Sequence, residues 1–164
     1  MTLQEFFLKQ KKAIRKRSEE VFELLRPEHM DWKPGRDALG VGEMLRHLWV
    51  SEEGVRRVAL EGDFAYYEAR IPGGLNAVLG TVGSLVDELK NIARVHRDTL
   101  EAVSMRPAEI FEEERANPSL GFRRKVSVIL FGINEHEIHH RAQLMMCLRM
   151  LGRPAPQPFE WPRK

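Results

Sequence analysis

Residues 134–144, with the sequence NEHEIHHRAQL, carry the feature from which the fold can be argued: three histidines within five positions. Successive residues of an α-helix turn by about 100°, so positions three and four apart share a face. His136 and His140 therefore lie on the same side as the apolar residues of the surrounding segment, whereas His139 falls off that side. The stretch predicts a helix over residues 124–151 whose apolar side carries two inward imidazoles.

Three further segments repeat their apolar residues at helical spacing and end near helix-breaking residues. We expect helices over residues 3–25, 41–60 and 81–103. Long connections separate the four helices, at residues 26–40, 61–80 and 104–123. No segment shows the strict alternation typical of a strand. The sequence predicts an all-α fold, a four-helix bundle with long interhelical connections in place of short hairpins.

The length of 164 residues suits a single domain. We expect residues 1–164 to form one, with residues 153–164 as an extended, proline-rich tail. Neither a signal peptide nor a long apolar segment is visible, which predicts a cytoplasmic protein without a membrane span. One cysteine, Cys147, excludes an internal disulfide and a cysteine-based zinc site.

The charge balance bears on possible partners. Lys and Arg total 26 against 24 Asp and Glu, and the net charge of +2 disfavours nucleic-acid binding. We expect the basic residues of the first helix to form a solvated face. They are Lys9, Lys11, Lys12, Arg15, Lys16 and Arg17.

The two inward histidines point to a metal site. Imidazoles that face a core one turn apart are costly to bury unpaired, and a metal ion bound at this spacing removes the cost. A third ligand must come from another helix. His47, at the edge of the second helix's apolar face, is the best candidate, and His96 on the third helix is its rival. For His96 we favour simple burial in the core, and we expect His29 to meet solvent.

Three motifs, in order along the chain, resemble those of the DinB-like (YfiT-like) family of metalloenzymes. They are DWKP at residues 31–34, GEMLRHLWVSEE at 42–53 and HEIHHRAQL at 136–144. The last resembles the family's metal-binding helix, although Ala142 stands where Gly is common. The resemblance implies a four-helix bundle and a divalent metal held by His47, His136 and His140. Zinc or nickel is the expected metal, with manganese and iron as alternatives.

The resemblance also implies a function. Characterised relatives include thiol S-transferases that use bacillithiol or mycothiol, and an isomerase; members are often dimeric. We therefore expect a homodimeric, metal-dependent thiol S-transferase, or a related hydrolase or isomerase, that acts on a small molecule. Since Cys147 is the one cysteine, the reactive sulfur would come from a low-molecular-weight thiol. The alternative is a non-catalytic, metal-stabilised stress-response bundle. In that case a fourth ligand such as His96 would fill the remaining coordination position of the metal.

The same helix offers a second interpretation. His136-Glu137-x-x-His140 matches the HExxH pattern of zinc peptidases, in which Glu137 would be the general base. Glu160 is a tempting third ligand, but Gly152 and the proline-rich tail separate it from the helix. No predicted strand could bind an extended peptide, so a metallohydrolase of this type is the less favoured alternative.

Two carboxylates are candidates for a role beside the imidazoles. Glu43 precedes His47 by one helical turn, and Glu137 lies at the edge of the face that carries His136 and His140. Either could orient an imidazole by accepting a hydrogen bond from it. A solvated carboxylate is an equally good interpretation of both.

Overall fold

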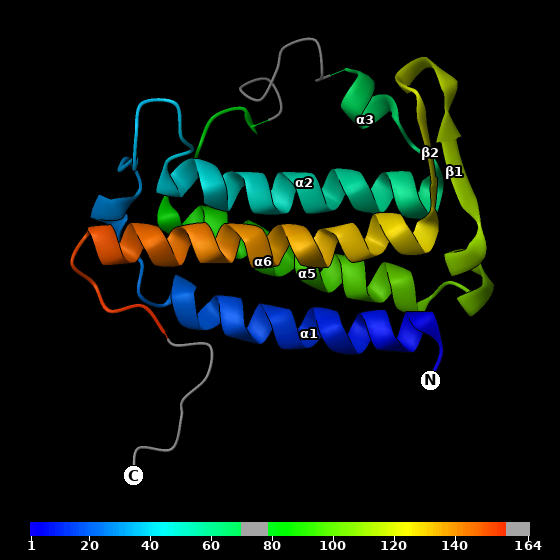
Figure 1. The fold of residues 1–164 in the computed structure, drawn as a ribbon, viewed down its shortest axis with the longest axis horizontal. Helices are drawn as coiled ribbons and strands as arrows, with labels where there is room; N and C mark the ends of the chain where they lie inside the picture. The colour runs from blue at the N-terminus through cyan, green and yellow to red at the C-terminus, as the bar shows by residue number, and fades with distance from the viewer. Residues whose placement is uncertain (70–78, 157–164) are drawn as a thin grey trace.

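The computed structural model describes residues 1–69 and 79–156, so most of the expected proline-rich tail lies outside the described residues. Four long helices lie side by side (Figure 1). They are α1 (Leu3–Phe22), α2 (Val41–Glu61), α5 (Leu85–Ser104) and α6 (Val126–Met150). The all-α, four-helix prediction is confirmed. None of the helices in the described ranges combines the length and apolar character needed to cross a membrane.

Short elements occupy the connections. They are η1 (Pro27–His29), α3 (Ala65–Glu68), η3 (Ala108–Glu112), β1 (Glu114–Asn117), η4 (Pro118–Leu120) and β2 (Phe122–Lys125). β1 and β2 pair antiparallel, with Glu114 opposite Lys125 and Asn117 opposite Phe122. The expectation that the chain holds no strand was therefore wrong. Both strands are largely exposed, and Ala116 and Phe122 are their apolar residues, so neither shows an alternation of apolar and polar side chains.

Local capping sets the helix ends. The Thr2 side chain and Glu5 form a reciprocal capping box at the start of α1. The Ser84 hydroxyl accepts a hydrogen bond from the Asp87 backbone N–H, so α5 begins at residue 85 and not at 81. α1 ends at Phe22, three residues before the expected end. α6 begins two residues later than expected, because 124 and 125 belong to β2.

The connectivity of the bundle explains its long loops. α1 and α2 both pack against α5 and α6, so α1 lies diagonally across the bundle from α2, and α5 from α6. α1 and α6 run in one direction, and α2 and α5 in the other (Figure 1). The connection from α2 to α5 must therefore return along the whole bundle, and the other two must cross its ends.

The core has two apolar halves with a buried polar layer between them. One half gathers residues such as Phe22, Leu45 and Leu144, and the other gathers residues such as Phe7, Ala59 and Ile133. Along α6, Glu137 and His140 are buried between Ile133 of one half and Leu144 of the other. Side chains from α1, α2 and α5 meet α6 at this level, which places the polar layer at mid-bundle.

Candidate metal centre

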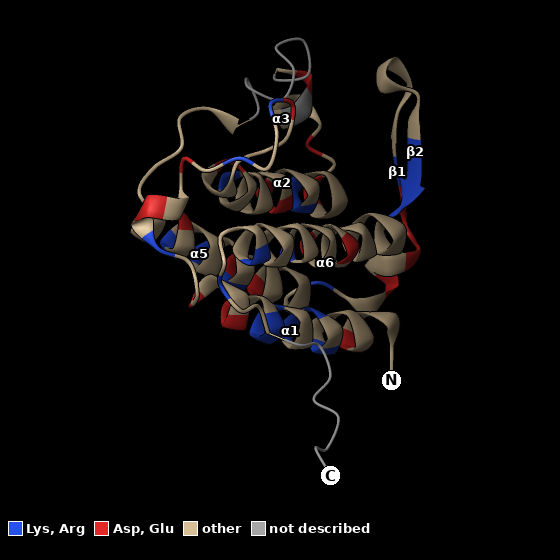
Figure 2. Cartoon of the chain, turned by 60° about the vertical axis from the view of Figure 1, so that its left-hand side comes forward, with Lys and Arg blue, Asp and Glu red and all other residues tan. Residues whose placement is uncertain are grey.

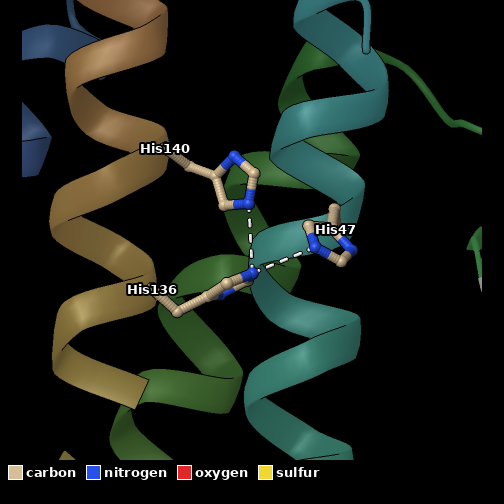
Figure 3. A group of neighbouring side chains, drawn as sticks. All are labelled: His47, His136 and His140. Carbon is tan, nitrogen blue, oxygen red and sulfur yellow. Dashed lines mark hydrogen bonds between the residues drawn. The ribbon is translucent and has the colours of Figure 1, made fainter. Parts of the chain in front are cut away.

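Three imidazoles from two helices meet in the polar layer. His47 comes from α2, and His136 and His140 come from adjacent turns of α6 (Figure 3). The Nε2 atom of His136 lies 3.0 Å from Nε2 of His47 and 3.0 Å from Nε2 of His140. The structure thus brings together the three histidines that the sequence singled out, and each presents the same ring nitrogen.

The opposite ring nitrogens of two of these histidines are held by other side chains. The Nδ1 atom of His140 donates to the Gln143 amide oxygen at 2.7 Å, and Nδ1 of His47 lies 3.1 Å from the Ser51 hydroxyl oxygen. Because an amide oxygen only accepts, the proton of His140 sits on Nδ1 and its Nε2 keeps a free lone pair. Such partners fix the orientation of metal-binding imidazoles.

Hydrogen bonding alone does not account for the cluster. Nε2 of His136 has one in-plane position, for either a proton or a lone pair, and yet it faces two other ring nitrogens. In contrast, a cation accepts the lone pairs of all three imidazoles at once. Zinc-bound nitrogens about 2.05 Å from a tetrahedral metal lie roughly 3.3 Å apart, close to the observed separations. The donor set therefore fits a divalent metal.

Burial keeps these imidazoles in the neutral form that binds metal. It lowers the pKa of His136 to about 3 and that of His140 to about 4. Burial also lowers the pKa of His47. Positive charge on the neighbouring imidazoles adds to each shift. Since a protonated imidazole has no lone pair to give, the low pKa values leave all three as ligands at neutral pH.

Glu137 does not join the histidines. Its side chain is 2 % exposed, and its two oxygens accept hydrogen bonds from Arg15 Nε and Nη2, both at 2.9 Å, and from Lys11 Nζ at 3.1 Å. Lys11 also pairs with Glu52 at 2.8 Å. The structure therefore places the proposed general base in a buried ion cluster that joins α1, α2 and α6, with both of its oxygens occupied.

The hydrogen bonds of Glu43 are also made away from the three histidines. Its carboxylate accepts hydrogen bonds from the Gly40 backbone N–H and from Lys33 Nζ, both at 2.8 Å. The first of these bonds lowers the pKa of Glu43 most, and Lys33 lowers it further. Glu43 thus caps the start of α2. The residue that lies within hydrogen-bond distance of His47 is Ser51, not Glu43.

His96 lies with the ion cluster and apart from the three histidines. Ligand atoms of His96, Glu52 and Glu137 lie within 4.8 Å of one another. Lys11 and Arg15 already neutralise both carboxylates there, which leaves little attraction for a further cation. Burial lowers the pKa of His96 to about 3, and the positive charge of Arg15 is the next largest cause of this shift. This imidazole is therefore neutral. His96 is half-buried, so the expected burial in the core is met only in part.

Some sequence expectations about charged residues were wrong. Lys11 and Arg15 are not on a solvated face but are buried, at 0 % and 5 % exposed. His29 is also buried, and its Nδ1 accepts a hydrogen bond from the Arg26 backbone N–H. The helical spacing could have revealed the cations, because Lys11 and Arg15 stand four residues apart beside the apolar Ile14.

Comparisons with known proteins identify the family and the fold. The model of the DinB superfamily matches residues 10–144. A DinB-like protein of Bacillus subtilis has a similar structure, with a TM-score of 0.64 and 19% identity over 94% of this chain and 95% of its own. A second similar structure is YfiT of Bacillus subtilis, described as a probable metal-dependent hydrolase with an unusual four-helix bundle topology. Its TM-score is 0.67 and its identity 12%, over 92% of this chain and 88% of its own. A comparison with curated proteins gives no match.

Proposed function

The chain belongs to the DinB superfamily, and from this premise we propose that it is a metal-dependent thiol S-transferase. Its divalent metal, zinc or nickel before manganese or iron, is held by His47, His136 and His140. The convergence of the three Nε2 atoms carries the proposal. Gln143 and Ser51 orient two of the imidazoles, which gives the site the pre-set geometry that metal ligation requires.

Three protein ligands leave a coordination position for a reactant. When bound, the metal would lower the pKa of a thiol at that position and so favour the nucleophilic thiolate. The sulfur would come from a low-molecular-weight thiol, because burial raises the pKa of the Cys147 thiol and keeps it inert. The acceptor would be a small electrophile.

The surroundings of the histidines favour thiol chemistry over hydrolysis. Hydrolysis at a metal commonly uses a carboxylate as general base. Within the described ranges, no carboxylate joins the three-histidine group, and Glu137 and Glu43 are engaged elsewhere. Hydrolysis remains the second candidate, because YfiT is described as a probable metal-dependent hydrolase.

The metal content of purified protein tests the proposal directly. We expect one divalent ion per chain by elemental analysis, and loss of stoichiometric binding in His136→Ala and in His140→Ala. His139→Ala is the matched control, since His139 is an exposed neighbour on the same helix. Metal retained by both cluster variants would falsify the site.

Activity assays separate the two chemistries. The metal-loaded protein is offered a set of low-molecular-weight thiols with a small electrophile, and in parallel a set of esters and amides without thiol. Conjugation that needs both thiol and metal supports the transferase. Metal-dependent hydrolysis without thiol supports the hydrolase, and a tightly bound metal with neither activity supports the non-catalytic bundle.

The homodimer and the small-molecule partner stay predictions. Light scattering of the purified chain measures the first. A mass of twice the 19.0 kDa of one chain is the expected result.

A further inference from the structure

Among the residues that the structure describes, two surface hollows border α6, and one of them opens onto the three-histidine cluster. The first, of about 380 Å³, is lined by His136 together with Ser51, the partner of His47. The second, of about 590 Å³, is lined by His139 and Gln143 but by none of the three clustered histidines. Of these two, only the first is lined by a histidine of the cluster, so it is the one through which a molecule could reach the cluster; we call it the His136 groove.

The His136 groove is an apolar channel that ends at an imidazole. Ile129, Ile133 and His136 line it from one face of α6, and Val55 of α2 and Phe122 of β2 add apolar walls. From Val128 to His136 the groove follows α6 for about 12 Å, at roughly 1.5 Å per residue. This size and lining suit a small, elongated and mainly apolar molecule.

Gly132 gives the groove its depth. It lines the hollow in the middle of α6, where a side chain would point into the channel. A Cβ built at this position meets no atom within 4 Å, so a larger residue would fill open space without a clash. A substitution here therefore blocks the channel selectively.

A cation stands at the far end of the His136 groove. Figure 2 shows Lys and Arg gathered on the β1–β2 hairpin. Three of the four basic residues there have carboxylate partners. They are Arg115 with Glu113 at 2.9 Å, Arg123 with Glu114 at 2.9 Å, and Lys125 with Glu112 at 2.7 Å. The fourth, Arg124, lines the groove, and among the described residues it bonds the Arg123 carbonyl oxygen but no carboxylate.

The groove therefore has one uncompensated charge in the part of the chain that is described. Glu52, its other charged lining residue, is neutralised by Lys11 and Arg15. An arginine without a carboxylate partner can take a carboxylate in bidentate fashion. Positive charge thus lies at one end, the histidine cluster at the other, and apolar walls between.

We propose that the His136 groove binds the acceptor substrate, and that this substrate is an elongated apolar molecule with a carboxylate end held by Arg124. Its reactive end lies at His136. The role of the groove in the reaction rests on the proposed function, but the binding itself does not. Arg124 determines specificity, and the apolar walls supply most of the buried area.

Binding of decanoate to the full chain tests the proposal, with and without added zinc, by isothermal calorimetry and NMR. We expect saturable binding that Arg124→Gln weakens by about tenfold or more, since a charge-assisted hydrogen bond is lost. Arg124→Lys should retain part of the affinity. Arg123→Gln is the matched control, because Arg123 pairs with Glu114 and does not line the groove. The uncharged decanol should bind equally to the wild type and to Arg124→Gln.

Variants that fill each hollow locate the bound probe. Gly132→Leu should abolish decanoate binding, and Ala142→Leu, which fills the other hollow, should leave it unchanged. Gly132→Ala shows that the helix tolerates a side chain at this position. The proposal is overturned if decanoate does not bind, if only Ala142→Leu blocks it, or if Arg124→Gln binds it as tightly as the wild type.

The two proposals fail in different ways. If decanoate binds but stoichiometric metal does not, the proposal of a carboxylate-binding groove stands and the proposed metal enzyme is contradicted. The opposite result is stoichiometric metal that is lost in His136→Ala and in His140→Ala, together with no decanoate binding. This result supports the metal centre and contradicts the carboxylate-binding groove.

Discussion

The Nδ1 atom of His140 lies 2.7 Å from the amide oxygen of Gln143, one turn further along α6. This contact orients the imidazole of His140 so that its Nε2 atom faces the Nε2 atom of His136 within the three-histidine cluster. Gln143 itself is exposed and belongs to neither half of the apolar core.

Gln143→Leu should weaken zinc binding by about 10- to 100-fold, because the imidazole loses the partner that orients it. Competition with a chromogenic chelator measures the affinity. Gln143→Glu keeps an acceptor oxygen and should restore tight binding. The stability of the metal-free protein should barely change in either variant. Equal zinc affinity in Gln143→Leu and the wild type would show that the contact has no orienting role.

Lys11→Met should lower the free energy of unfolding by about 3–5 kcal/mol, because it leaves Glu52 and Glu137 buried with one cation fewer. Urea unfolding measures the change. Lys12→Met, at the exposed neighbouring position, is the matched control and should stay within about 0.5 kcal/mol of the wild type. A similar small effect at both positions would contradict the buried cluster.

Acid should destabilise the metal-free protein through His96. Its pKa is about 3 in the folded chain against an ordinary 6.5, so below pH 6.5 the unfolded chain takes up a proton that the folded chain refuses. The free energy of unfolding therefore falls as the pH drops from 6.5 toward 3. His96→Leu should make this decline shallower in urea titrations at several pH values, whereas His139→Gln should not. An unchanged slope in His96→Leu would count against the burial of this imidazole.

Gly132→Ala should raise the free energy of unfolding by about 0.5–1 kcal/mol. Glycine is a poor helix former, and the added methyl group meets open space. Thermal unfolding checks the sign. A loss of stability would mean that the groove is filled by some other part of the protein.

Zinc should stabilise the wild type by about 2.7 kcal/mol when the free metal is a hundred times its dissociation constant. The thermal midpoint should rise accordingly and return when a chelator is added. His136→Ala should show no such rise. If its midpoint rises as much as that of the wild type, zinc acts at another site.

The sequence predicted the bundle and the inward pair of histidines because both depend on helical spacing alone. His136 and His140 are one turn apart, and their apolar neighbours show which way they face. His47 needed the family resemblance, since periodicity left His96 as a rival. The helix ends were less accurate where a short strand or a cap such as Ser84 decided them.

The buried ion cluster could not be predicted from charge patterning. Lys11 and Arg15 stand among exposed basic residues of α1, and only the packing of α1 against α6 shows that they face Glu137. Ion pairs over a sequence separation of more than a hundred residues leave no local pattern. For the same reason, Glu137 looked like a general base within HExxH, and its partners on α1 stayed hidden.

The diagonal connectivity also affects how the chain can fold during synthesis. α1 packs against α6, although more than a hundred residues separate them. Until α6 leaves the ribosome, Lys11 and Arg15 have no Glu137 to pair with, and α1 keeps part of its apolar face exposed. Contacts between distant segments slow folding, and incomplete chains with exposed apolar faces tend to aggregate. We therefore expect a nascent chain that ends before α6 to depend on chaperones.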